Sequence, residues 1–332
     1  MLLDDQIRSN RRKSIGMFGG FFVVYAAFAA AISFAIAGLQ AELNAIILIV
    51  FAVVAVVVIL FTLVLGDDMA VRVGGGRRVE QRSDAPELWD AVETMSIAAG
   101  IQRPRIYISP DKAPNAFAAG RSQEQALVCV TQGLLDTLDK EELEGVVAHE
   151  ISHIRNLDIR VMTYAAVLAG SIALIAQALL HINSIDLFDS DGPVWLLLVR
   201  LLVFLFALLL APVAALVIQL AISRRRELLA DASAADITRY PQGLASALRQ
   251  ISSSGVAPRH SRQAIAHLYI MAPAQAKGTR FSNLLSTHPP VAERLARLDG
   301  LAGGQLHNRR PRAPGEPMTL VLGDTPDEAS TA

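Results

Sequence analysis

The sequence contains little charge of either sign and a single cysteine. One cysteine excludes a disulfide within the chain, so nothing indicates an oxidising compartment. The apolar run around Cys129 instead predicts a buried thiol. The 30 lysines and arginines are balanced by 31 acidic residues, which leaves a formal net charge of −1. This balance excludes the broad positive field expected of a nucleic-acid-binding protein.

Apolar residues are abundant where charge is scarce. Of the 332 residues, 52% are hydrophobic and 18% are charged, and the mean hydropathy is +0.40. Soluble chains are typically about 25% charged, so the composition indicates contact with lipid. A stretch of about 20 apolar residues in a helix spans the hydrocarbon core of a bilayer. The sequence predicts four such helices, at residues 17–39, 45–65, 161–180 and 194–222.

Basic residues are distributed unevenly around these four stretches. Lysine or arginine precedes the first stretch and follows the second and the fourth, whereas the connections at 40–44 and 181–193 contain neither. By the positive-inside rule, both termini and both polar parts of the chain face the cytoplasm. The third stretch is the weakest of the four, because polar side chains dilute it and a polar helix runs almost directly into it.

The polar parts carry the local patterns of a small mixed fold. We expect residues 66–160 and 223–299 to form one catalytic unit around the second membrane hairpin at 161–222. Residues 1–65 supply the N-terminus and the first hairpin, and residues 300–332 have the composition of a disordered tail. Periodicity predicts helices over 85–99 and 241–251, strands over 105–109 and 126–131, and a further strand over 115–120.

The chemistry is indicated by the segment His149-Glu150-Ile151-Ser152-His153, which lies in a helical pattern beginning near residue 138. On a helix, positions i and i+4 share a face, so both imidazoles can reach one metal ion, with the carboxylate of Glu150 near a bound water. In a chain of this composition, His-Glu-x-x-His is expected about 0.006 times by chance. The pattern therefore predicts a catalytic zinc site, with one Zn²⁺ per chain.

A catalytic zinc ion takes about three ligands from the protein, so a third must come from elsewhere. Glu227 and Asp231 are again four residues apart, and one could bind the metal while the other accepts a hydrogen bond from a ligand histidine. Acidic pairs at this spacing are also common on solvated helices. From spacing alone, the assignment stays open against His181, His260 and His267.

Four sequence features resemble one family. They are His149-Glu150-Ile151-Ser152-His153, Glu227-x-x-x-Asp231, Asn115-Ala116-Phe117-Ala118-Ala119-Gly120, and Thr287-His288-Pro289-Pro290 followed by Arg294. Together they resemble the HtpX-type membrane zinc metalloproteases, which are relatives of the prenyl-protein (CaaX) proteases. The resemblance extends over about Met17 to Leu298.

The resemblance implies an α+β fold, in which a four-helix transmembrane region carries a mainly α-helical, zincin-type catalytic part with a small β-sheet. It implies that Glu227 is the third zinc ligand and that Asp231 lies behind a ligand histidine. It further implies that residues 115–120 form an edge strand, where an extended substrate contacts its first four residues, Asn115, Ala116, Phe117 and Ala118. His288 and Arg294 are implied beside the active site, either stabilising the oxyanion or anchoring the closing helix.

These features predict a zinc metalloendopeptidase of the bacterial inner membrane that cleaves misfolded or damaged membrane proteins at the cytoplasmic face, in stress response and protein quality control. Glu150 would serve as general base toward a zinc-activated water. Two alternatives stay open: a CaaX-type prenyl-protein peptidase, and a non-catalytic membrane scaffold. The sequence leaves substrates, cleavage preference and oligomeric state undetermined.

Overall fold

The computed structural model describes residues 75–169, 224–256, 268–270 and 289–304, together with isolated positions between 12 and 71 and at 201 and 205. Most of the first and second apolar stretches, nearly all of the fourth, and residues 170–180 of the third lie outside the described residues. Within the described part of the chain, no helix has the length and hydropathy needed to cross a membrane. His288 and residues 305–332 also lie outside the described part.

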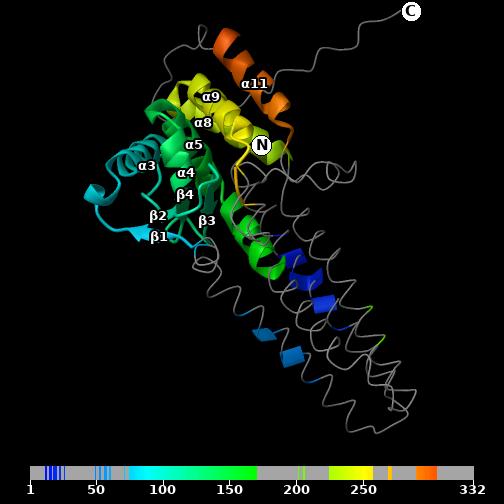
Figure 1. The fold of residues 1–332 in the computed structure, drawn as a ribbon. Helices are drawn as coiled ribbons and strands as arrows, with labels where there is room; N and C mark the ends of the chain where they lie inside the picture. Colours follow the sequence, from blue (N-terminus) through cyan, green and yellow to red (C-terminus); the bar gives the residue numbers. More distant parts are fainter. Residues whose placement is uncertain are drawn as a thin grey trace, which may run out of the picture.

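A four-stranded mixed sheet forms the base of the catalytic part (Figure 1). Its order is β1-β2-β4-β3, in which β2 and β4 are parallel and the two outer pairs are antiparallel. The strands are β1 (Arg77–Val79), β2 (Arg105–Ser109), β3 (Ala116–Ala119) and β4 (Leu127–Thr131). The three predicted strands are thus confirmed within a residue or two, and β3 is an edge strand among the described residues.

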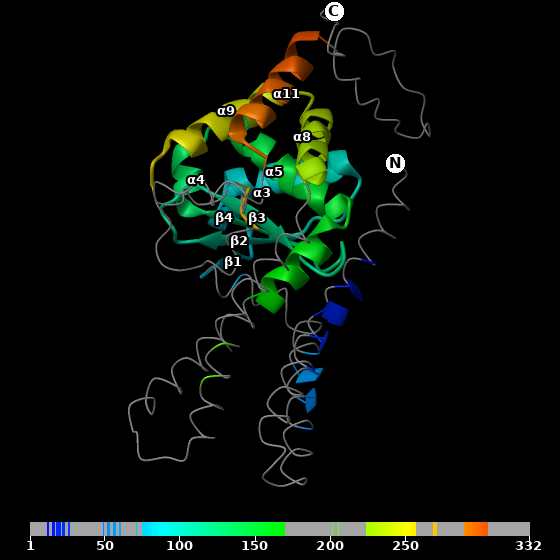
Figure 2. The ribbon, with the colours of Figure 1, turned by 90° about the vertical axis from the view of Figure 1, so that its right-hand side faces the viewer.

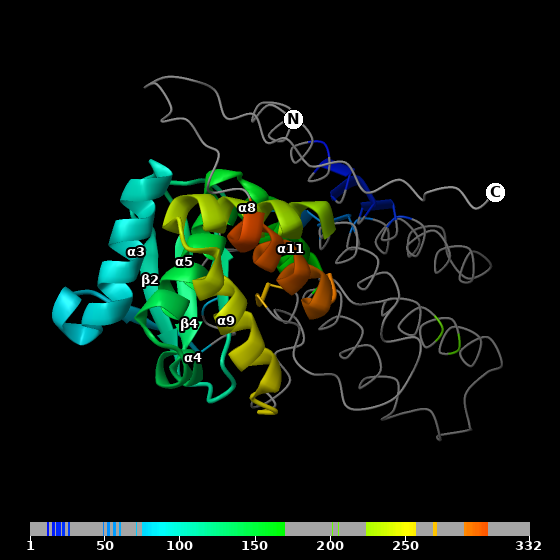
Figure 3. The same ribbon diagram turned by 90° about the horizontal axis from the view of Figure 1, so that it is seen from above.

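Helices cover the sheet in two layers (Figures 2 and 3). α3 (Pro86–Ala99) and α5 (Lys140–Arg155) lie next to the strands, and α5 contacts both β3 and β4. α8 (Arg224–Thr238), α9 (Pro241–Ser253) and α11 (Val291–Gly304) pack further out, with α8 and α9 against α5. A short helix, α4 (Gln132–Thr137), and a 3-10 turn, η1 (Arg82–Asp84), also belong to this part.

Both faces of the sheet are buried. Alternate residues such as Val128 and Val130 join the main core beneath α3 and α5. The other set, including Phe117 and Cys129, packs into a second cluster on the opposite face. This two-sided burial follows from the period-2 direction of strand side chains and explains why β4 is apolar from Leu127 to Val130. The predicted buried thiol of Cys129 is confirmed, with 1% exposure.

The second cluster extends into the predicted third membrane stretch. Residues 158–169 are helical, and Met162 and Ala166 pack in the cluster with Phe117. The hydroxyl of Thr163 also accepts a hydrogen bond from the Gly120 amide at 3.0 Å. The first turns of this stretch therefore belong to the core of the catalytic part, so a boundary at residue 160 divides a packed element.

Two further boundaries differ from expectation. The sequence suggests that the metal-binding helix runs almost directly into the third stretch, but α5 ends at Arg155 and a turn at residues 156 and 157 separates the two helices. The first residues of the tail expected from Gly300 are helical, because α11 continues to Gly304. The apolar residues Leu295 and Leu301 pack against the core and extend this helix.

Candidate active site

Helix α5 places three of the predicted functional residues on its buried side. The helix begins with a capping box in which the carboxylate of Asp139 accepts from the Glu142 amide, and that of Glu142 accepts from the Asp139 amide. Gly145 lets α9 approach closely, since a side chain there would meet the Leu244 backbone nitrogen at 2.6 Å. The helix is therefore held at its start and in its middle, and the six residues after Ala148 are all buried.

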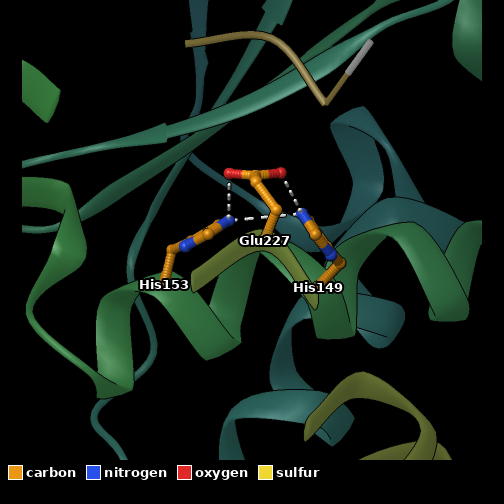
Figure 4. A group of neighbouring side chains, drawn as sticks. All are labelled: His149, His153 and Glu227. Atoms are coloured by element: carbon orange, nitrogen blue, oxygen red, sulfur yellow. Dashed lines mark hydrogen bonds and ion pairs between the residues drawn. The ribbon is translucent and has the colours of Figure 1, made fainter. Parts of the chain in front are cut away.

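His149, His153 and Glu227 meet at one point (Figure 4). The two imidazole Nε2 atoms lie 3.2 Å apart. The carboxylate oxygens of Glu227, from the first turn of α8, lie 3.8 Å from Nε2 of His149 and 3.6 Å from Nε2 of His153. All three side chains are at most 4% exposed. The competing histidines at positions 181, 260 and 267 lie outside the described residues.

These donor atoms suit a tetrahedral metal ion. With metal–ligand bonds of about 2.0–2.2 Å, tetrahedral ligand atoms stand about 3.3–3.6 Å from each other. The two Nε2 atoms, 3.2 Å apart, lie close to that spacing, and each imidazole has a different Glu227 oxygen at 3.6 or 3.8 Å, so one oxygen from this carboxylate and the two nitrogens lie within 4.8 Å of one another. Two neutral imidazoles and one carboxylate also form the ligand type of a catalytic zinc, with a fourth position left for water or substrate. The residues present thus fit the predicted zinc ion.

His149 contacts a buried ion pair formed by Asp231 and Arg294. The His149 Nδ1 atom lies 2.9 Å from Oδ1 of Asp231, although not aligned as a hydrogen bond. Arg294 donates from Nε and Nη2 to the two oxygens of Asp231 at 2.8 and 2.7 Å. Burial would raise the pKa of Asp231, but the charge of Arg294 and the contact with His149 lower it to about 2. Asp231 is therefore ionised and holds Nε2 of His149 toward the metal position.

Arg294 is fully buried, which distinguishes between its two predicted roles. Besides Asp231, it donates from Nη1 to the carbonyl oxygen of Ile270 at 2.9 Å. The two bonds to Asp231 anchor α11 to α8, and the third ties α11 to the segment of residues 268–270. The geometry thus favours the anchoring role, and the position of His288 lies outside the described residues.

His153 contacts a second ion pair, formed by Asp158 and Arg226, which was not predicted from the sequence. The His153 Nδ1 atom lies 3.3 Å from Oδ2 of Asp158, and Arg226 donates to Oδ1 of the same carboxylate at 3.2 Å. Burial lowers the pKa of His153, but the hydrogen bond with Asp158 and the charge of Glu227 outweigh it and raise that pKa to about 9. The signal available in the sequence for this contact was that Asp158 follows His153 by five residues.

Glu150 lies beside the three donors. It is 2% exposed, and burial raises the pKa of its carboxyl to about 7, with the charge of Glu227 adding to the shift and that of His153 opposing it. Its carboxylate also accepts a hydrogen bond from the backbone of Ala118 on β3. A carboxyl with a pKa near neutrality can both accept and return a proton.

The four residues predicted to contact substrate are on or next to β3, and all are buried. The pairing with β4 directs the backbone groups of Ala116 and Ala118 to the outer edge. One of these groups is already used, because the Ile270 amide donates to the Ala116 carbonyl at 2.9 Å. Figure 4 shows the chain around residues 268–270 passing near the ligand side chains. Substrate pairing at Ala116 therefore requires this hydrogen bond to open.

Comparisons with known proteins find one matching family and similar chains. The sequence model of peptidase family M48 matches residues 82–302. Proteins named "Protease HtpX homolog" from Limosilactobacillus reuteri (strain DSM 20016) and Streptococcus gordonii (strain Challis) are 39% and 38% identical to this chain over 304 and 302 residues. Each alignment covers 90% of this chain and 99% of the relative.

Among solved structures, the crystal structure of S. mikatae Ste24p aligns with 89% of this chain and 66% of its own. The TM-score is 0.42 and the sequence identity is 15%. This similarity is too distant to inform on function.

Proposed function

Because this chain belongs to peptidase family M48 and is a metallopeptidase, we propose that it is a zinc endopeptidase that cleaves misfolded or damaged membrane proteins at the cytoplasmic face of a bacterial inner membrane. One observation carries the proposal: His149, His153 and Glu227 converge with the spacing of zinc ligands, and Glu150 lies next to them in the same buried site. A purely structural zinc site would not need Glu150 in addition to the three ligands.

Each residue of the site has a distinct task in peptide hydrolysis. When bound to the two histidines and Glu227, Zn²⁺ supplies Lewis acidity that polarises a peptide carbonyl and lowers the pKa of water to about 7. Glu150 accepts the proton of the attacking water and returns it to the leaving amine. The pKa of its carboxyl, raised by burial to about 7, suits both transfers. Asp231 and Arg294 keep His149 in orientation throughout.

The substrate is proposed to bind as an extended strand along β3. The outward backbone groups of this edge strand lie above α5, and Ala118 itself contacts Glu150. Main-chain pairing reads the shape of an unfolded segment more than its sequence. This mode suits a protease that recognises unfolded segments of damaged proteins.

The membrane setting is proposed from the four apolar stretches of the sequence. Helix α5 is followed after a two-residue turn by the helix of residues 158–169, which opens the third stretch. The metal site thus lies close in sequence to a predicted membrane entry. Cytoplasmic loops of membrane proteins, or segments extracted from the bilayer, would pass near it.

The zinc assignment is tested by metal analysis of the full-length chain purified in detergent. We expect about one zinc per chain in the wild type and little in His149→Ala. Glu150→Gln serves as the matched control, because it changes a neighbouring buried side chain that does not bind the metal. Unchanged zinc in His149→Ala would contradict the ligand set.

The substrate class is tested by incubating zinc-loaded enzyme with three substrates. These are unfolded casein, a membrane protein and a prenylated C-terminal peptide, each also incubated with Glu150→Gln. Cleavage of the first two by the wild type alone supports the proposal. Cleavage of the prenylated peptide alone would establish the CaaX-type alternative, and cleavage of none by zinc-loaded enzyme would support the scaffold.

A further inference from the structure

The Nδ1 atom of each ligand histidine contacts a carboxylate, and each of these carboxylates forms an ion pair with an arginine. Asp231 contacts His149 and is paired with Arg294. In the same way, Asp158 contacts His153 and is paired with Arg226. We propose that Asp158 and Arg226 are a positioning pair for the metal centre, which sets the orientation of His153 and its distance from Glu227. This inference rests on the proposed zinc site.

The first step of the argument is the contact with His153. Its Nε2 faces His149 and Glu227, while its Nδ1 faces Asp158 at 3.3 Å. A carboxylate at Nδ1 selects the tautomer that presents a lone pair from Nε2 to a metal, and it limits rotation of the ring. Asp158 is 1% exposed, so water does not replace it in this role.

The second step is the local backbone. Leu157 has a φ of +56°, in the left-handed region that a branched side chain rarely adopts. Such a conformation costs about 1–2 kcal/mol and persists where the surrounding structure requires it. It interrupts the helix after α5, and Asp158 then lies 3.3 Å from Nδ1 of His153. A straight continuation of the helix would place Asp158 roughly 140° around the axis from His153.

The third step is the position of Arg226. It immediately precedes Glu227 on α8, so the residue that binds Asp158 and the third ligand are adjacent in the chain. The Arg226 side chain is 11% exposed, which makes its 3.2 Å contact with Asp158 less screened than a surface ion pair. A shift of α8 along α5 would therefore break the ion pair between Arg226 and Asp158 and would at the same time move Glu227 away from His153.

The alternative is a purely local role, because Asp158 also stands at the start of the helix of residues 158–169. Acidic residues and serine both suit the first turn of a helix. Asp158→Ser therefore keeps the local role and removes the contact with His153. Arg225→Ala is the matched control for Arg226→Ala, because Arg225 is exposed and directly precedes it.

The test measures the zinc dissociation constant of the full-length chain in detergent, by competition with a fluorescent chelator, and the visible spectrum of the Co²⁺ form. Asp158→Ser should weaken zinc binding by about 10- to 100-fold and alter the tetrahedral cobalt bands, with unchanged circular dichroism of the metal-free chain. Arg226→Ala should weaken binding about tenfold, Arg226→Lys should restore most of it, and Arg225→Ala should have no effect.

The double variant Asp158→Ser/Arg226→Ala should bind zinc no more weakly than Asp158→Ser alone, because both residues act through one contact. Wild-type zinc affinity in Asp158→Ser, additive losses in the double variant, or loss of fold in every variant would overturn the proposal. Absence of zinc binding by the wild type would instead contradict the proposed function, so the two failures are distinguishable.

Discussion

Replacing Arg294 by methionine should strongly destabilise the catalytic part. Methionine occupies much of the same space but carries no charge and donates no hydrogen bond. The substitution removes two charge-assisted bonds to Asp231 and one to the Ile270 carbonyl. It also leaves the carboxylate of Asp231, which is 3% exposed, without its counter-charge.

Breaking a buried ion pair on one side typically costs about 3–5 kcal/mol, because one charge stays buried and uncompensated. The whole stability of a domain is only about 5–15 kcal/mol, so much of it would be lost. We expect the additional substitution Asp231→Asn to recover part of this loss. The double variant should be less destabilised than the sum of the single variants, by about 1–3 kcal/mol.

The assay is urea unfolding of the metal-free full-length chain in detergent, followed by circular dichroism, so that loss of zinc does not add to the result. Arg297→Met is the matched control: it lies one turn further along α11 and is half exposed, with only a 3.7 Å contact to Glu293. Its effect should stay within about 0.5 kcal/mol. Equal stability of the two methionine variants would refute the role assigned to Arg294.

Three other outcomes follow from the site and the sequence. Glu150→Gln should retain zinc while the cleavage rate falls by about 10²- to 10⁴-fold, and a fully active variant would exclude Glu150 as the base. Zinc affinity should rise about tenfold for each pH unit between about pH 6 and 8. The reason is that His153, whose pKa is raised to about 9, must release a proton to bind metal. A zinc affinity independent of pH would contradict this prediction. In a Cys129→Ala background, an impermeant thiol reagent applied outside the cell should label a cysteine introduced at Ser190 but not one at Ser122, and labelling at Ser122 would reverse the proposed orientation.

The sequence alone determined the features that depend on near neighbours. The spacing of His149 and His153 places both on one face of any α-helix, whatever surrounds it. Strand β2 could be predicted because alternation and β-branching act within a few residues. The acidic pair of Glu227 and Asp231 was recognisable as a candidate by the same i, i+4 rule. Choosing it over distant histidines required the family resemblance, because spacing carries no information on which helices meet.

Only the tertiary structure decided which polar groups stand behind the ligands. Arg294 reaches Asp231 across 63 residues of sequence, and Arg226 reaches Asp158 across 68. Even Asp158, five residues after His153, could not be assigned from sequence. On a continuing helix it would have pointed away, and no glycine marks the left-handed turn at Leu157 that redirects it. Packing of α8 against α5 provides Arg226 as the partner of Asp158.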